Sequence, residues 1–243
     1  MKAAFHAGAA GLLAQQAAMD NIGNNIANVN IYGYKAENVG FESLLAHEMY
    51  VNLDDKPLTG VGVRAVGLGL NTQQGSFHNT GNTLDFAIQG EGWFAVDNNG
   101  TREYTRSGAF QIGLVNNVPY LTDAFGCFVL DGAGNRIQIP QGEGSSVDLT
   151  GIADRVGVFV VERSSAMQPT AENRYRVNDA TGTVRAAVEG DDYTLRQGAV
   201  EFSNVKMEDE MTNMIMAQRA FQMSARVVQT SDELEQEVNT LRM

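Results

Sequence analysis

The residue types that could perform chemistry are few, and they are spread along the chain. The three histidines, His6, His47 and His78, lie in different segments and form no His-x-x-x-His spacing. The one cysteine, Cys127, stands beside Phe128 in an apolar run, where a thiol is usually a core residue rather than a nucleophile. Because zinc coordination needs several such ligands at close spacing, the sequence predicts no zinc site and no disulfide framework.

Other motifs with a chemical appearance have simpler structural explanations. The stretch 131–135, Asp-Gly-Ala-Gly-Asn, lacks the acid register and closing Glu of a calcium loop and favours a tight turn. The glycine pairs at 60–62 and 67–69 are not followed by the Gly-Lys-Ser/Thr of a nucleotide loop. Trp93 is typical of a sheet core. We therefore predict no enzyme activity, no cofactor and no bound metal.

The charge balance limits the partners of this chain of 243 residues. It carries 17 Lys and Arg against 29 Asp and Glu, a net charge of −12. Because nucleic acids and anionic membranes attract basic surfaces, both are unlikely partner classes. No apolar run is long enough to span a membrane, and Gly8, Gly11 and Gln15 interrupt the apolar start. We therefore expect a protein that neither spans a membrane nor carries a cleaved signal peptide. If it works outside the cytoplasm, it leaves by a route that reads no such signal.

The segment from Asn204 to Met243 predicts one long helix. Its apolar residues recur at spacings of three and four: Met207, Met211, Met214, Phe221, Ala225 and Val228. Asn204 is a candidate N-cap, and three acids, Glu208 to Glu210, suit the positive end of the helix dipole. At about 1.5 Å per residue the helix would reach roughly 55 Å, so its stripe needs a partner.

Residues 1–30 carry a matching helical pattern. The apolar positions are Phe5, Leu12, Met19 and Ile26 at intervals of seven, with Ile22 and Val29 at a second heptad position. Alanines make the segment helix-prone, while Gly8, Gly11 and Gly23 each cost about 1 kcal/mol. Such a helix needs packing, and we expect the C-terminal helix to supply it. A simple two-helix hairpin on one globule is the alternative at this point.

The C-terminal stripe changes phase after Val228. Leu234, Val238 and Leu241 continue an apolar face, but Asp232 and Glu235 occupy positions that a strict heptad fills with apolar residues. The last turns are therefore expected to face a different neighbour.

Asparagines mark the end of the first helix. Asn25 and Asn28 are candidate caps or turn formers, and Gly33 supplies a stop. Residues 31–74 are expected to form an extended connecting segment, with a short helix at 41–46 and a strand at 60–66.

From residue 75 to 197, short apolar runs alternate with turn residues, which predicts an all-β domain. The candidate strands are 84–88, 92–96, 103–106, 109–112, 119–122, 127–130, 136–139, 155–161 and 174–177. Asn99-Gly100 predicts a two-residue hairpin turn. The expected fold is mixed: helices at 1–30 and 198–243 pair as a coiled-coil-like domain, with 31–74 as the linker and 75–197 as the inserted β domain.

Three stretches resemble bacterial flagellar rod and hook proteins. The first is 24–35, Asn-Asn-Ile-Ala-Asn-Val-Asn-Ile-Tyr-Gly-Tyr-Lys, where Ile31 replaces the usual threonine. The second runs from Thr80-Gly81-Asn82 through Gly90-Glu91-Gly92-Trp93-Phe94 to Tyr104-Thr105-Arg106-Ser107-Gly108. The third is Glu201-Phe202-Ser203-Asn204-Val205 with the helix that follows. The resemblance spans nearly the whole chain.

The resemblance implies a structural subunit of the flagellar basal-body rod. The implied partners are other copies of the chain, other rod and hook proteins, and the flagellar type III export apparatus. Gly60-Val61-Gly62-Val63-Arg64 is similar to distal-rod proteins, which we favour over proximal-rod ones, although Gly92-Trp93 is similar to the latter. The alternatives are a hook-type axial protein and a carbohydrate-binding β module that uses Trp93, Tyr104 and Tyr120.

The same resemblance implies that the paired terminal helices form the inner layer of a helical tube. The expected contact residues are the apolar positions of the two helices: Leu12, Met19, Ile22, Ile26, Met211, Met214, Phe221, Val228, Leu234 and Leu241.

Overall fold

The computed structural model describes residues 2–44, 47–48, 58–60, 62–140, 149, 151–190 and 192–241. The chain forms two units. Unit 1 comprises residues 1–27, 37–68 and 206–243, and unit 2 comprises residues 28–36 and 69–205. Each unit therefore contains segments that are far apart in the sequence.

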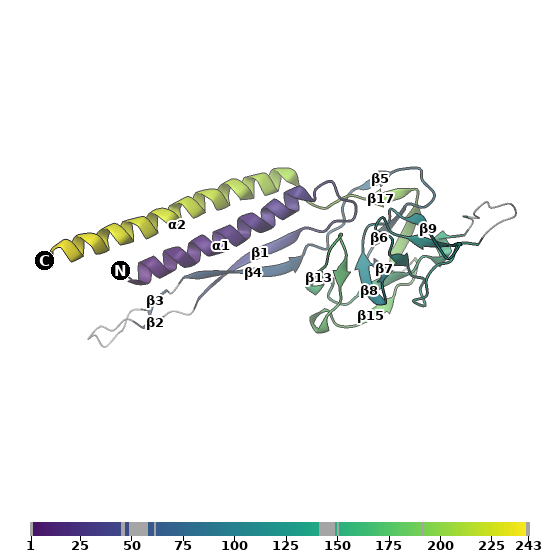
Figure 1. The fold of residues 1–243 in the computed structure, drawn as a ribbon, viewed down its shortest axis with the longest axis horizontal. Coiled ribbons are helices and arrows are strands. Elements are labelled where there is room, and N and C mark those ends of the chain that lie inside the picture. The colour runs from purple at the N-terminus through teal and green to yellow at the C-terminus, as the bar shows by residue number, and fades with distance from the viewer. Residues whose placement is uncertain are drawn as a thin grey trace. The chain divides into compact units, whose positions relative to one another are not determined.

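Unit 1 is built from two long helices and a narrow β-ribbon (Figure 1). The helices are α1 (Lys2–Ala27) and α2 (Met207–Leu241). In the ribbon, β1 (Glu37–Ser43) pairs with β4 (Val63–Leu70), and β2 (His47–Glu48) pairs antiparallel with β3 (Leu58–Thr59). No helix among the described residues is both long and apolar enough to cross a membrane.

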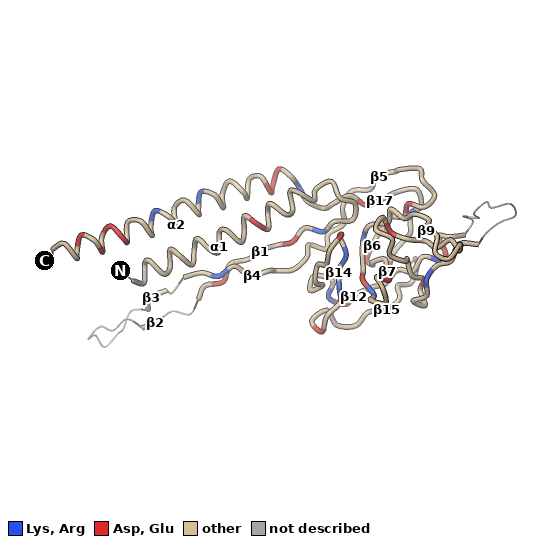
Figure 2. The backbone as a smooth tube through the Cα atoms, in the orientation of Figure 1, with Lys and Arg blue, Asp and Glu red and all other residues tan. Residues whose placement is uncertain are grey.

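The sequence of each helix explains how it begins and ends. α2 starts three residues after Asn204, and its first turn carries Glu208, Asp209 and Glu210, whose charges suit the positive helix end. α1 ends at Ala27, and Asn28 accepts a hydrogen bond at 3.1 Å from the Ile31 amide in the following turn. Figure 2 shows few charged residues along α1 and more along α2, because α1 is largely composed of small residues.

The two helices pack antiparallel through small side chains of α1. A Cβ built on Gly8 would lie 2.9 Å from Val228 Cγ2, and one on Gly23 would lie 4.0 Å from Met214 Cε. Between these points Ala14 and Ala18 are buried, with 3% and 7% of their surface exposed. The glycines that weaken α1 as an isolated helix therefore permit close contact with α2.

The expected short helix at 41–46 is wrong over its described part, because β1 extends to Ser43 as a strand. Residues 45 and 46 lie outside the described residues. Pairing with β4 explains the difference, since the ladder satisfies the backbone of a stretch too short to form a stable helix alone. The expected strand at 60–66 is confirmed from Val63 onward.

Unit 2 is dominated by a nine-stranded sheet with the order β13-β14-β8-β7-β11-β10-β9, in which β12 joins β7 to β15. Its strands are β7 (Trp93–Asn98), β8 (Thr101–Thr105), β9 (Gln111–Val115), β10 (Val118–Thr122), β11 (Phe128–Val129), β12 (Val158–Val161), β13 (Gln168–Pro169), β14 (Tyr175–Arg176) and β15 (Val184–Ala186). Two further antiparallel pairs are β6 (Phe86–Gly90) with β16 (Tyr193–Gln197) and β5 (Phe77–Asn79) with β17 (Ala199–Glu201).

Three short 3-10 helices lie between the later strands, at Ala153–Arg155, Ser164–Ala166 and Asp179–Thr181. The first of them replaces the start of the strand expected at 155–161, which begins only at Val158. Residues 136–139 make isolated bridges at Arg136 and Gln138 rather than a named strand.

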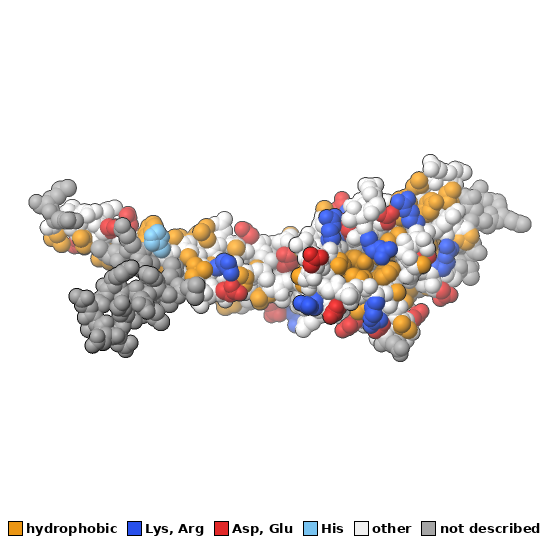
Figure 3. Space-filling view, turned by 90° about the horizontal axis from the view of Figure 1, so that it is seen from below, with side chains coloured by type: hydrophobic (Ala, Val, Ile, Leu, Met, Phe, Trp, Pro, Cys, Tyr) orange, Lys and Arg blue, Asp and Glu red, His pale blue; other side chains and the backbone are white. Residues whose placement is uncertain are grey.

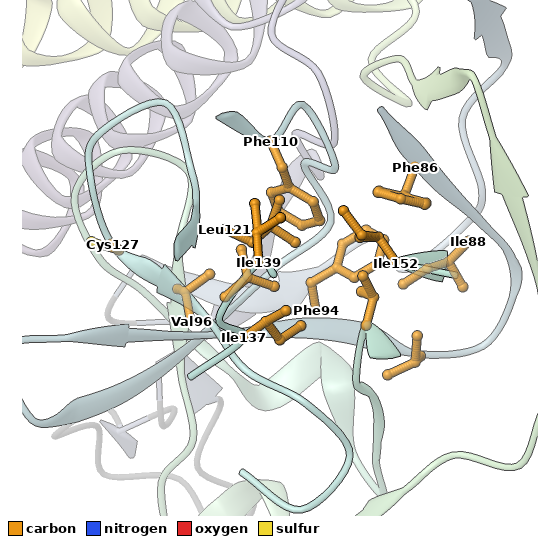
Figure 4. Packing of buried hydrophobic residues seen from close by; sticks show 13 residues of the cluster. Phe86, Ile88, Phe94, Val96, Phe110, Leu121, Cys127, Ile137, Ile139 and Ile152 are labelled. Atoms are coloured by element: carbon orange, nitrogen blue, oxygen red, sulfur yellow. The ribbon is translucent and has the colours of Figure 1, made fainter. Parts of the chain in front are cut away.

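The sheet core is formed by alternate residues of neighbouring strands (Figure 4). Phe86, Ile88, Phe94 and Val96 are fully buried, and Cys127 belongs to the same cluster, as expected for a core thiol. The turn at Asn99-Gly100 is confirmed, with φ of 50° and 89°, and it joins β7 to β8. Asp131 caps the predicted tight turn by accepting from the amides of Ala133 and Asn135.

Candidate assembly surfaces and a buried junction

Three predicted contact residues of α2 lie on its face toward α1. Met214, Phe221 and Val228 recur every seven residues and are all half-buried. Val228 and Met214 line the positions of Gly8 and Gly23 on α1. These side chains therefore hold the two helices together within one copy of the chain.

The other predicted residues of α2 are open to solvent. Met211 and Leu234 each expose 52% of their surface, and Leu241 exposes 83%. On α1, four predicted residues are half-buried: Leu12, Met19, Ile22 and Ile26. The predicted set thus divides between contacts inside the helical pair and side chains that reach its surface.

Exposed apolar residues continue along a second face of α2, which we call the outward stripe. Their successive spacings of seven, four, seven, four and three place them on one side of the helix: Met216, Met223, Val227, Leu234, Val238 and Leu241. Each exposes at least 45% of its surface. Figure 3 shows hydrophobic side chains at the surface of unit 1. A continuous apolar stripe of this kind marks a contact surface rather than isolated exposed residues.

Asn25 joins α1 to β1 and to α2. Its side chain donates to Glu37 O at 3.0 Å and accepts from Glu37 N at 3.1 Å, so it pairs with the first residue of β1 as a strand would. It also donates to Glu210 Oε1 of α2 at 3.0 Å. Burial raises the pKa of Glu210, and the Asn25 bond opposes this rise. Asn25 thus ties α1, β1 and α2 together.

A groove with a volume of about 380 Å³ lies beside this junction. Asn25, Glu37 and Glu210 supply its polar end, and Phe41 and Met216 supply apolar surface. The groove is therefore continuous with the outward stripe through Met216.

The remaining predicted cap and turn residues belong to unit 2. Gly33 has φ of 68°, and its N–H donates to Glu201 O at 2.7 Å. The Asn204 side chain accepts from Ala36 N at 2.8 Å and donates to the carbonyls of Asn71 and Gln73. It is thus engaged with the segments 28–36 and 69–75 rather than with the first turn of α2.

A buried ionic junction that no sequence pattern predicted lies next to Gly33. Lys35 Nζ lies 2.6 Å from Glu201 Oε1, and Arg106 Nη1 lies 2.9 Å from Glu201 Oε2. The three side chains are almost completely buried, with at most 5% of any of them exposed. We call this set the Lys35–Glu201–Arg106 cluster.

Backbone groups satisfy most of the remaining polar atoms of the cluster. Lys35 Nζ donates to Gln73 O at 2.8 Å, and Gly75 N donates to Glu201 Oε1 at 2.8 Å. Arg106 donates to Ile88 O and Gly90 O, and its guanidinium lies 5.7 Å from the centre of the Trp93 ring. Burial lowers the pKa of Lys35 and of Arg106, and Glu201 opposes both shifts.

A signal for this cluster was present in the sequence. Each member belongs to one of the three stretches that resemble rod and hook proteins: Gly33-Tyr34-Lys35, Tyr104-Thr105-Arg106 and Glu201-Phe202. In each of these three short motifs one charge stands beside apolar or small residues. Charged residues are almost never fully buried unless they are paired, so these three could have been matched with one another.

The structure argues against the carbohydrate-binding alternative. Trp93 and Tyr104 expose only 3% and 4% of their surface, and both belong to a buried cluster with Tyr175. Trp93 packs edge-on against Tyr175, and Tyr104 packs against Phe159. Of the three proposed stacking residues only Tyr120 is half-exposed, so they do not form a platform for a sugar ring.

Three protein-family models match separate segments of this chain. Residues 5–35 match the model described as flagella basal body rod protein, residues 87–154 match the flagellar hook protein FlgE/F/G D1 domain, and residues 196–241 match the flagellar basal body rod FlgEFG protein C-terminal.

Individual relatives agree with the family models. The flagellar basal-body rod protein FlgG of Bacillus subtilis is 33% identical, over 100% of both chains. FlgG of Borreliella burgdorferi is 30% identical, over 100% of this chain and 99% of its own. FlgF of Caulobacter vibrioides is 32% identical, over 89% of this chain and 88% of its own.

Proposed function

Because the chain belongs to the family of flagellar basal-body rod proteins, we propose that it polymerises helically through its terminal helices into the shaft that transmits torque. It is a structural subunit of the rod and resides in the flagellar basal body. Within that role the helices of unit 1 are the assembling part.

The outward stripe of α2 is the observation that carries this proposal. Its six apolar side chains remain exposed after α1 has packed on another face of the same helix. Burying them against another subunit removes apolar surface from water at about 25 cal/mol per Å². Polymerisation therefore stabilises a helical pair that is incompletely covered in one copy.

The assembly is open because the contact joins unlike surfaces. The outward stripe lies on α2, and the half-buried residues Leu12, Met19 and Ile26 lie on α1. A contact between two different faces of identical subunits gives a filament when its rotation does not close. Segments 1–30 and 198–243 then form the coiled-coil-like inner layer, 31–74 the connecting segment, and 75–197 the β domain.

The distal rod is the favoured position within the shaft. The proteins named FlgG align over the full length of this chain, which is consistent with a distal-rod subunit. Relatives named FlgF also align over most of it, and the hook-type axial protein remains the alternative. The neighbours are then other rod and hook proteins.

Delivery of the subunit is assigned to the flagellar type III export apparatus, without cleavage of a signal peptide. The composition of α1 supports this route, since a helix with three interior glycines is weak alone and unfolds readily. The same helix regains order when α2 and neighbouring subunits cover it.

Leu234→Asp is expected to abolish rod assembly while unit 2 stays folded. Leu234 exposes 52% of its surface in one copy, so the carboxylate has little effect there, but in the polymer it becomes an unpaired buried charge. We expect assembly to weaken about a hundredfold or more. Motility of cells carrying only the variant reports assembly, and the fluorescence of Trp93, which lies in unit 2, reports folding.

Gln229→Asp is the matched control, because it introduces the same charge at an exposed polar position of α2. Cells with this variant should remain motile. Normal motility with Leu234→Asp would show that the outward stripe is not an assembly surface.

A further inference from the structure

The Lys35–Glu201–Arg106 cluster holds two cations and one carboxylate in a buried place. Both cations contact Glu201, one at each carboxylate oxygen. Arg106 Nε has no hydrogen-bond partner in the structure. The nearest further acid that acts on the cluster is Glu91, which is exposed and influences Arg106. The cluster therefore depends on one carboxylate to offset two buried positive charges.

We propose that this cluster is a closure latch: given the export route proposed above, Glu201 locks unit 2 only after β17 has been delivered behind Lys35 and Arg106. Lys35 and Arg106 both precede Glu201 in the sequence. Without Glu201 they would be two like charges in the same buried place, and closing the unit around them would be strongly unfavourable. The arrival of β17 supplies the missing carboxylate.

The latch also joins residues 28–36, which follow α1, to residues 201–205, which precede α2. Lys35 stands two residues before β1, and Glu201 stands six residues before α2. Backbone bonds reinforce the charge contact: Gly33 N donates to Glu201 O at 2.7 Å, and Ala36 N donates to Asn204 Oδ1 at 2.8 Å. Opening the cluster should therefore release residues 28–36 and 201–205 together.

A second buried ionic cluster differs from the first in its balance of charges. Glu103 bonds Arg174 at 2.8 Å and Arg176 at 2.9 Å, and Arg174 also contacts Asp123 and Glu172. There three acids face two cations, and all five residues lie within 103–176. This second cluster contains no residue of 28–36 or 201–205, although its sequence neighbours Asn173 and Tyr175 bond Tyr32 O and Lys35 N. It therefore provides a control with similar charge contacts that do not involve Glu201.

Glu201→Gln in the full chain tests the latch by hydrogen exchange. The substitution keeps the shape of the side chain but leaves two buried cations without an anion. We expect amide exchange at Gly33, Lys35 and Ala36 to accelerate about a hundredfold or more, together with that of residues 201–205. Glu103→Gln should accelerate exchange around Arg174 and Arg176 and leave Gly33, whose N–H donates to the Glu201 carbonyl, protected. Unchanged protection of residues 28–36 in Glu201→Gln would overturn the proposal.

Lys35→Met keeps the test decisive if Glu201→Gln fails to fold. Lys35→Met leaves Glu201 paired one to one with Arg106. Its unfolding equilibrium constant should therefore change at least about tenfold less than that of a variant without Glu201. The double variant Lys35→Met/Glu201→Gln should regain part of the lost stability, because only one cation then lacks a partner. If Lys35→Met destabilises unit 2 as much as loss of Glu201, the charge surplus plays no part.

The pH dependence gives a second readout of the surplus. Burial lowers the pKa of Lys35 from 10.5, and the charges around its ammonium group are Glu201 and Arg106. The Tyr175 hydroxyl accepts a hydrogen bond from the Lys35 backbone N–H. Between the lowered pKa of Lys35 and about 10.5, the unfolded chain therefore holds a proton on Lys35 that the folded chain has lost. Because the unfolded state binds more protons in this window, the free energy of unfolding rises with pH across it. The free energy of unfolding of the wild type, minus that of Lys35→Met, should rise with pH over that window. A difference that stays flat or falls would contradict the latch.

Discussion

Gly33→Ala should unfold unit 2 or destabilise it by about 3 kcal/mol or more. Gly33 has φ of 68°, a conformation that costs a residue with a Cβ about 1 to 2 kcal/mol. The added Cβ would also overlap the backbone of Arg106 and Ser107. Relieving this overlap moves Arg106 away from Glu201, so the strain spreads to the buried cluster. Chemical unfolding followed by Trp93 fluorescence measures the loss.

Gly81→Ala separates the two causes. Gly81 has a similar φ of 73°, but no atom lies within 4 Å of a Cβ built there. The free energy of unfolding of Gly81→Ala should therefore fall only by the cost of the backbone conformation, about 1 kcal/mol. Equal losses in the two variants would show that the close approach of residue 33 to Arg106 is unimportant.

Ala14→Leu should disrupt the packing of α1 within unit 1 and prevent assembly. Ala14 exposes 3% of its surface, so a larger side chain there must displace its neighbours. Overpacking such a contact costs about 1 to 3 kcal/mol, which is large for a helix already weakened by glycines. We expect reduced helical content by far-UV circular dichroism and non-motile cells.

Ala17→Leu makes the same change at an exposed position of the same helix. It should leave helical content and motility close to those of the wild type. If Ala14→Leu behaves in the same way, close packing of α1 within unit 1 is not needed for the rod.

The sequence predicted the long elements because their patterns are long. The apolar spacing of residues 207–228 and the alanines of residues 1–27 each extend over many turns, and both form helices. Most strands of the central sheet were also anticipated from their bounding turns, including the hairpin at Asn99-Gly100. In unit 2 the strands β5, β13, β15, β16 and β17 were not predicted. All but β16 are runs of two or three residues, which carry too little periodicity to recognise.

The contacts between distant segments could not be derived from local pattern. Gly8 occupies a position of the predicted heptad and Gly11 weakens the helix, yet α2 packs closely against both because they lack side chains. Asn25 suits a cap by residue type, but its position inside α1 lets it pair with the backbone of Glu37. Lys35, Arg106 and Glu201 are separated by 166 positions of the chain at most, and only the fold brings them together.

A cryo-EM map of isolated basal bodies tests the central claim most directly, that exposed apolar faces of paired terminal helices build the rod. The account predicts density for α1 and α2 in the innermost wall of the rod, with the outward stripe, Met216 to Leu241, covered by other subunits. Absence of the chain from the rod, or a rod in which that stripe faces solvent, would contradict it.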